Sequence, residues 1–232
     1  MRKSILFFIM GLILISSVSA NYLENMTLYL SFDDDDLSGS DPLDLTGHYT
    51  TDNIGCGTGV SAVVNQGFEL EYTDLEYLNL GHVVLHNDYS FSISWWEKRE
   101  SLGADFDASL GWNASGVQPF FIGSGTGAKA SKMTLYSSSD CSNWDISSAG
   151  MGTAAIDLAA PTLWTFIFNS SHYRLYKNTT LVDLVVSNKT VCDKAADFIL
   201  GRRENDAQFQ SDLTYADELA VWENRSLTAA EV

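Results

Sequence analysis

The stretch Phe91-Ser92-Ile93-Ser94-Trp95 decides the fold, because its apolar side chains alternate strictly with serines. A period of two puts successive side chains on opposite faces of a β-strand, so that one face is apolar. The same period recurs in residues 27–32, 163–168 and 219–222, and clusters of Gly, Ser, Asn and Asp separate these runs, whereas no helical periodicity of useful length is present. The pattern predicts an all-β single domain with about a dozen short strands in an antiparallel two-sheet sandwich or jelly roll.

The first twenty residues have the pattern of a signal peptide. A basic start at residues 1–4 precedes an unbroken apolar run over residues 5–15, and Val18-Ser19-Ala20 supplies the small-x-small pattern that signal peptidase cleaves. The apolar run is about half as long as a membrane-spanning helix. We therefore expect a signal peptide over residues 1–20 and one folded domain over residues 21–232, with no later membrane span. The sequence leaves open whether the signal is retained as an anchor.

The charge balance excludes several classes of partner. The chain has 30 acidic and 13 basic residues and a formal net charge of −17. Phosphates need a basic protein face, so this balance argues against nucleic acid, and it also argues against a polybasic contact with anionic lipid. Because 45% of the residues are hydrophobic and only 19% are charged, intrinsic disorder is excluded as well.

Sequons for N-glycosylation support export to a secreted or extracellular-surface location. Composition alone predicts about two or three sequons in a chain of this kind, and the sequence has six. The acceptors would be Asn25, Asn113, Asn169, Asn178, Asn188 and Asn224. Each sequon predicts an exposed asparagine in a loop or at an outward strand position.

The three cysteines are Cys56, Cys141 and Cys192. In an oxidising compartment we expect one disulfide and one free thiol, and the sequence does not choose among the three pairings. No Cys-x-x-Cys spacing is present, which argues against a thiolate zinc site.

Several short motifs occur in a fixed order along the chain: residues 28–33, 67–70, 91–96, 164–168, 174–178, 198–202 and 216–222. Together they resemble the laminin-G-like, concanavalin A-like jelly-roll superfamily over about residues 26–232. The resemblance implies a two-sheet jelly roll, but it says less about function, because the fold carries lectins, adhesion modules, hydrolases and passive spacers. The turn glycine of the family is replaced by Thr179, so we expect the hairpin at this position to differ and to carry a glycan.

The acidic stretch of residues 33–39 is a candidate calcium site. Asp34 and Asp36 alternate as they do at the start of a calcium loop, but the twelfth position lacks the bidentate Glu, which excludes the helix–loop–helix motif. In proteins similar to this family, calcium often lies where the first strand meets the last, and the resemblance implies Asp33, Asp44 and Asp217 as its ligands. The alternative is a solvated acidic loop.

Residues 69–74 contain the acids Glu69, Glu71 and Asp74 and invite comparison with an enzyme signature. Jelly-roll β-glucanases place Glu-x-Asp-x-(x)-Glu on one strand as nucleophile and general acid. Here the middle and last acids are of the wrong type, and the acids alternate with Phe68 and Leu70, which favours an outward polar face. No Gly-x-Ser-x-Gly nucleophile elbow occurs either. We therefore predict no catalytic residues and no enzymatic activity.

Two tryptophans are candidates for ligand binding. Trp112 and Trp144 lie in polar, loop-like surroundings, and exposed aromatic faces stack on sugar rings. Trp95, Trp164 and Trp222 lie in alternating strands and are predicted to be core residues.

We conclude from the sequence that the protein is a secreted or cell-surface, non-catalytic recognition or adhesion module for a glycan or a surface glycoprotein. Two alternatives stay open: a structural component of a surface layer, envelope or filament, and a glycan-cleaving enzyme of the same fold. The oligomeric state also stays open, a homo-oligomer included.

Overall fold

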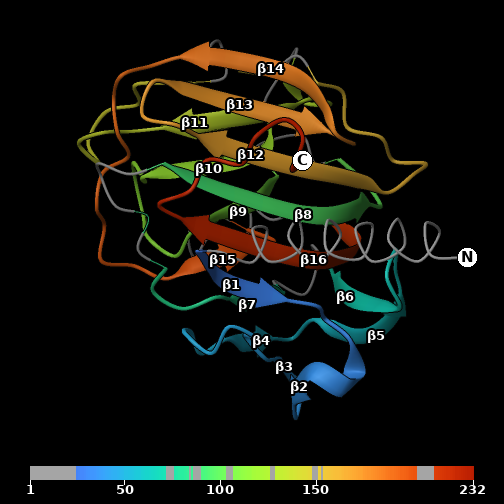
Figure 1. Ribbon diagram of the computed structural model, residues 1–232. Helices are drawn as coiled ribbons and strands as arrows, with labels where there is room; N and C mark the ends of the chain where they lie inside the picture. Colours follow the sequence, from blue (N-terminus) through green and yellow to red (C-terminus); the bar gives the residue numbers. More distant parts are fainter. Residues whose placement is uncertain are drawn as a thin grey trace, which may run out of the picture.

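The computed structural model describes residues 25–71, 76–83, 85, 90–102, 107–125, 129–147, 151–152, 154–202 and 212–232. In this part of the chain two antiparallel sheets pack face to face as a jelly-roll β-sandwich (Figure 1). The predicted all-β fold is thus confirmed. The predicted signal peptide lies outside the described residues, among which no helix is long and apolar enough to cross a membrane.

The larger sheet has eight strands among the described residues, in the order β14-β13-β12-β8-β16-β6-β5, with β1 also paired to β16. Its strands are β1 (Met26–Leu30), β5 (Gly57–Ser61), β6 (Gln66–Leu70), β8 (Phe91–Arg99), β12 (Thr162–Phe168), β13 (His172–Lys177), β14 (Thr180–Val186) and β16 (Leu213–Glu223). The first and last described strands are therefore neighbours, as the resemblance implies.

The smaller sheet has the order β11-β10-β9-β15-β7-β4. Its strands are β4 (Asp52–Ile54), β7 (Tyr77–Asn79), β9 (Ala108–Trp112), β10 (Phe120–Ser124), β11 (Met133–Ser137) and β15 (Phe198–Leu200). Between β1 and β4 lie a short 3-10 helix, η1 (Asp34–Asp36), and a small ribbon formed by β2 (Leu37–Ser38) and β3 (Asp41–Pro42).

The core between the sheets follows from the alternation in β8. Phe91, Ile93 and Trp95 are all buried there, and Phe91 stacks on Phe120 of the smaller sheet with ring centroids 5.6 Å apart. Burial of large aromatic side chains is the main favourable contribution to folding in such a core. The core placement predicted for Trp95 is confirmed, as it is for Trp164.

The inward side of β8 then continues with two charged residues. Arg99 is fully buried, and its Nε donates to Glu97 Oε1 at 3.0 Å, while its Nη2 donates to Ser109 Oγ at 2.6 Å. Trp95 Nε1 donates to the other oxygen of Glu97 at 3.0 Å. Each buried charge thus has hydrogen-bonded partners, which burial of charge requires.

Trp222 is buried as predicted, but on the outer face of the larger sheet. It packs there with Ile167, Tyr176 and Leu227 in a second hydrophobic cluster. Leu227 of the C-terminal segment after β16 belongs to this cluster, and the segment passes in front of β8 and β12 (Figure 1). It is anchored at Ser92 of β8, whose hydroxyl donates to Arg225 O and accepts from Leu227 N. Both faces of this part of the larger sheet are therefore covered by protein.

The disulfide joins Cys141, in the loop after β11, to Cys192, in the segment after β14, and Cys56 is a buried free thiol. The prediction of one disulfide and one free thiol is confirmed.

The hairpin between β13 and β14, where the sequence predicts a departure from the family pattern, has a two-residue turn. Lys177 pairs with Thr180, and the two residues between them, Asn178 and Thr179, have φ values of 48° and 70°. The favoured hairpin turns have positive φ at such positions. Asn tolerates this conformation, whereas a β-branched Thr is strained in it.

Candidate binding groove and acidic junction

A groove of about 540 Å³ lies on the outer face of the larger sheet, bounded by β1, β8, β12, β16 and the C-terminal segment. Trp96, Tyr29 and Glu218 line it, together with the hydroxyl-bearing Ser94 and Thr165. We call it the outer groove. It combines two aromatic side chains, two carboxylates (Glu218 and Glu231) and the hydroxyls of Ser94 and Thr165 within a volume typical of small-molecule sites.

Strand alternation explains why Trp96 lies in the outer groove. Trp95 faces the core, so Trp96 must face outward, and it remains only half-buried. In the sheet, Trp96 pairs with Leu163 of β12 on one side and with Asp217 of β16 on the other. The indole therefore lies between the apolar part of the groove and its acidic end.

A β-bulge in β16 forms that acidic end. Asp217 pairs with Trp96 and Ala220 pairs with Ser94, so two residues of β16 oppose one residue of β8. Glu218, one of these two residues, has a φ of 52°. Non-glycine residues with positive φ are strained, and such strain is common at functional sites.

Glu218 is joined to the first strand by a hydrogen bond from Tyr29 Oη to its Oε2 at 2.5 Å. Burial raises the pKa of the Tyr29 hydroxyl, and the hydrogen bond to Glu218 adds to this shift. Burial also raises the pKa of Glu218; the bond from Tyr29 opposes this shift, while the charges of Asp33 and Asp36 increase it. Negative charge is therefore concentrated where β1 meets β16.

We call the group Asp33, Asp36, Asp217 and Glu218 the acidic junction. Asp217 is fully buried, and its Oδ2 accepts a hydrogen bond from Val64 N at 2.8 Å. Its Oδ1 is buried with no hydrogen-bond partner among the described residues. The Asp217 pKa is raised to about 7: burial is the largest cause and the charges of Glu218 and Asp33 add to it, while the hydrogen bond from Val64 N opposes it.

Asp33 and Asp217 both accept hydrogen bonds from residues of the turn between β5 and β6. Asp33 Oδ1 accepts a hydrogen bond from Gln66 N, and its Oδ2 accepts one from Asn65 Nδ2, both at 3.1 Å. The neighbouring amide, Val64 N, donates to Asp217. The structure thus brings together the two acids that the resemblance implies at the first and last strands. Asp217 Oδ1 is buried without a hydrogen-bond partner among the described residues, but the carboxylate oxygens of this junction do not form a group of three within 4.8 Å of one another, so calcium here stays a prediction.

Two other predicted calcium ligands, Asp34 and Asp36, have different hydrogen-bond partners. Asp36 Oδ2 accepts from Ser31 Oγ at 2.6 Å, and the exposed Asp34 accepts from Gln66 Nε2 at 2.9 Å. Asp34 is therefore turned toward solvent and the β6 side chain, and only Asp36 adds its charge to the junction.

Asp44 stabilises the loop that follows it, and ties this loop to β1. Its carboxylate accepts hydrogen bonds from the backbone N–H groups of Tyr29, Thr46, His48 and Tyr49, and from the Thr46 hydroxyl. Burial opposes ionisation of Asp44, but these donors outweigh it and lower its pKa. Both oxygens of Asp44 thus accept hydrogen bonds, as those of Asp33 do, and the assignment of Asp44 as a calcium ligand stays a prediction.

The interpretation of Trp112 as an exposed platform is wrong. It ends β9, is only 3% exposed and packs on Phe198 with ring centroids 5.2 Å apart. Its polar sequence neighbours belong to the following turn. Trp144 is half-buried on the outer face of the smaller sheet, edge-on to Phe121 and Tyr136.

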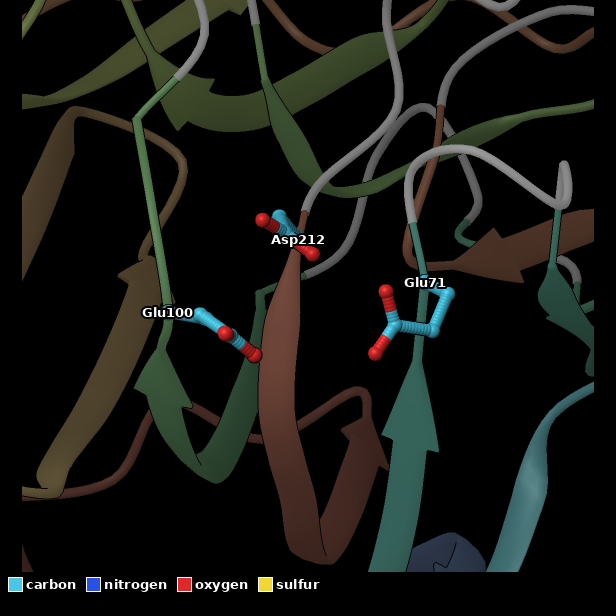
Figure 2. Close-up of side chains that lie close together, drawn as sticks. All are labelled: Glu71, Glu100 and Asp212. Carbon is cyan, nitrogen blue, oxygen red and sulfur yellow. The ribbon is translucent and has the colours of Figure 1, made fainter.

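A second group of carboxylates lies at the ends of three neighbouring strands. Glu71 follows β6, Glu100 follows β8 and Asp212 precedes β16, and their oxygens lie within 4.8 Å of one another (Figure 2). Burial raises the pKa of Glu71, and the charges of Asp212, Glu69 and Glu100 raise it further. Sequence spacing singles out Glu71 but does not predict this group, because the three residues converge only through the order β8-β16-β6.

The strand carrying Glu69 has the predicted outward polar face: Phe68 and Leu70 are buried and Glu69 is half-buried. Asp74, the third acid of the compared motif, lies outside the described residues.

The sequon asparagines are all at least partly accessible. Asn25, Asn178, Asn188 and Asn224 are exposed, and Asn113 and Asn169 are half-buried. The expected accessibility is thus present, and glycosylation itself stays a prediction.

Comparison with known proteins places the fold in a family. Residues 74–232 match the family model of the concanavalin A-like lectin/glucanases superfamily. The chain belongs to this superfamily, whose name covers both sugar-binding lectins and sugar-cleaving glucanases. A search of curated proteins finds no match.

Solved structures share the same architecture. Domain 4 of AbnA, a GH43 extracellular arabinanase from Geobacillus stearothermophilus in complex with arabinotriose, is 20% identical, with a TM-score of 0.64 over 89% of this chain and 96% of that one. The binding domain of Paraclostridial Mosquitocidal Protein 1 is 14% identical, with a TM-score of 0.66 over 90% and 51%. A mutant of Trypanosoma rangeli sialidase that displays trans-sialidase activity is 13% identical, with a TM-score of 0.65 over 90% and 32%.

The chain therefore spans about half of the mosquitocidal chain and about a third of the sialidase chain. At these identities the likeness concerns the fold alone.

Proposed function

We propose that this chain is a non-catalytic glycan-recognition module that binds its ligand in the outer groove. The observation that carries the proposal is the half-buried Trp96 in a groove shared with Tyr29 and Glu218. A pyranose ring offers a C–H face that stacks on an indole, and its hydroxyls require nearby hydrogen-bonding groups. Membership of a superfamily of lectins and glucanases supports this choice of ligand class.

The polar groups of the outer groove suit sugar hydroxyls. Glu218 supplies a carboxylate acceptor, whereas the hydroxyls of Ser94 and Thr165 lie buried at the floor of the groove and contact each other, with 3.0 Å between Oγ and Oγ1. Tyr29 holds Glu218 in place, so the acceptor is fixed before the ligand arrives. A preorganised polar group costs less to order on binding than a free one.

Calcium at the acidic junction is the second part of the proposal. Asp33 and Asp217 would hold the ion, and Asp36 and Glu218 would add to the negative field around it. Bound calcium would neutralise the mutual repulsion of these acids and keep Asp217 ionised in its buried position. Because Glu218 belongs to both sites, the ion would also stabilise the acidic end of the outer groove.

A glycan-cleaving enzyme is the second candidate, and one observation favours it. The outer groove contains Glu218, whose pKa is raised, and Glu231, whose pKa is lowered by the Thr228 backbone and by Arg225. Two carboxylates with such opposite shifts are typical of glycosidases. We favour recognition because Arg225 and Thr228 already engage Glu231, and Tyr29 already engages Glu218.

A glycan array tests the proposal. We expect the wild-type protein to bind a restricted set of glycans, and Trp96→Ala to bind them about 30-fold more weakly, which corresponds to about 2 kcal/mol. The matched control is Trp144→Ala, on the other sheet, which should bind normally. Equal binding by wild type and Trp96→Ala would contradict the proposal. Release of reducing sugar that Glu218→Gln abolishes would instead support the enzyme.

A further inference from the structure

The charged groups that line the outer groove are all of one sign. Glu218 and Glu231 are among the described residues that line it, whereas no lysine, arginine or histidine is. Glu231 forms an ion pair with Arg225 through Oε1 and accepts a hydrogen bond from Thr228 N at its Oε2, so both of its oxygens are engaged. Glu218 has no cationic partner within the described part of the chain. Its charge is therefore the one that a ligand could balance.

Glu218 also keeps one oxygen for a ligand. Tyr29 Oη donates to its Oε2, and no hydrogen bond from the described residues reaches its Oε1. The charges that act on Glu218 come from Asp33 and Asp36, which are both acidic. The acidic end of the outer groove is thus a region of negative potential, which attracts cations and repels anions.

The single lysine near this end does not change that balance. Lys98 shares the outward face of β8 with Trp96, because the two residues are two positions apart in the strand. It neither lines the outer groove nor adds to the charges that act on Glu218.

An aromatic side chain lies beside the Glu218 carboxylate. Trp96 pairs in the sheet with Asp217, the residue that precedes Glu218 in the bulge, and Trp96 and Glu218 both line the groove. The face of an indole attracts a cation as well as the C–H face of a sugar ring. An ammonium group carries three N–H donors and makes short, charge-assisted hydrogen bonds to carboxylates. The groove therefore suits a sugar ring that carries a positive charge.

We propose that the outer groove recognises a glycan with a free amino group, a hexosamine whose amine is not acetylated, and discriminates against acidic sugars. The inference rests on the proposed function, because it names the ligand class of the same groove. The ammonium group would donate to Glu218 Oε1 while the pyranose ring stacks on Trp96. N-acetylation removes the positive charge, and a sugar carboxylate would meet Glu218 with no basic residue in the groove lining to balance it.

The test is isothermal titration calorimetry with three oligosaccharides of equal length, built from glucosamine, N-acetylglucosamine or a uronic acid. The buffer contains chelator, so that no divalent cation screens the acidic junction, and has a pH of about 7, at which such an amine is largely protonated. We expect the glucosamine form to bind about tenfold more tightly than the N-acetylated form, and the uronic acid form to bind most weakly. Because the added contact is ionic, the preference should shrink as salt is raised.

Three variants locate the preference. Glu218→Gln should bind the glucosamine and N-acetylglucosamine forms equally, because the amide keeps an oxygen for Tyr29 but carries no charge. The matched control is Glu71→Gln, which removes an acid outside the groove and should keep the tenfold preference. Trp96→Ala should weaken both forms to a similar extent, because the ring of each stacks on the indole.

The outcomes separate this inference from the proposed function. If none of the three oligosaccharides binds, or Trp96→Ala binds as the wild type does, the proposed function fails and the inference falls with it. If Trp96→Ala weakens binding but the wild type binds the N-acetylated or uronic acid form as tightly as the glucosamine form, the inference alone is overturned. A tenfold preference that survives Glu218→Gln, or that Glu71→Gln abolishes, would overturn it in the same way.

Discussion

Removal of the Cys141–Cys192 disulfide gives the most quantitative test of the fold. The bond closes a loop with a sequence separation of 51 residues. For a loop of this length, the chain-entropy model assigns about 4 kcal/mol of stabilisation through restriction of the unfolded state. Cys141→Ala with Cys192→Ala should therefore lower the free energy of unfolding by about 4 kcal/mol.

Urea denaturation, followed by tryptophan fluorescence, measures this loss as a shift of the midpoint. The melting temperature should fall by roughly 8 to 16 °C for a domain of this size. Reducing agent should destabilise the wild type to a similar extent and leave the double variant unchanged. Cys56→Ala is the matched control, because it removes a buried thiol without opening a crosslink, and its cost should stay near 1 kcal/mol.

If the free energy of unfolding of the double variant falls by less than about 1 kcal/mol, the disulfide does not stabilise the protein by restricting the unfolded state as the model requires. Non-reduced peptide mapping that finds Cys56 in the disulfide would refute the pairing itself.

Three further predictions concern single sites. Thr179→Gly should raise the free energy of unfolding by about 0.5–1 kcal/mol, because Gly accepts the φ of 70° without strain; an unchanged urea midpoint would contradict this. Asp44→Asn should destabilise the protein at neutral pH. Since the folded pKa of Asp44 is lowered, its contribution is present above the unfolded pKa of about 3.9 and is lost as the pH falls further, so wild type and variant should converge in acid melts. Calcium at about a hundredfold excess over its Kd should stabilise the wild type by about 2.7 kcal/mol relative to chelator, and Asp33→Asn with Asp217→Asn should abolish this response. Glu71→Gln with Asp212→Asn is the control on the other carboxylate group. If only this control loses the calcium response, the ion binds at Glu71, Glu100 and Asp212 and not at the acidic junction.

The fold follows from the sequence to the extent that side-chain alternation determines it. Phe91, Ile93 and Trp95 lie in the core because a period of two leaves no other face for them. The same rule places Trp96 outward, although its position beside the acidic end of a groove requires the pairing of β8 with β16. The prediction of an exposed Trp112 is wrong because the polar neighbours of Trp112 belong to the next turn, while its own side chain faces the core.

The candidate site depends on features that sequence periodicity does not contain. The bulge that exposes Glu218 exists only in the register between β16 and β8. The buried Arg99 and Glu97 continue an inward face on which alternation would favour apolar residues, and their burial depends on partners distant in the chain, such as Ser109. Asp33 and Asp217 were identified through the resemblance, because no local spacing connects the first strand to the last.

The most direct test of glycan binding in the outer groove is photo-crosslinking with a diazirine-bearing form of the glycan that binds best on the array. Peptide mapping of the labelled protein should place the crosslink on β8 or β16, in the peptides containing Trp96 or Glu218, and excess unmodified glycan should suppress it. Labelling confined to the smaller sheet around Trp144, or spread evenly over the surface, would contradict the assignment of the ligand to the outer groove.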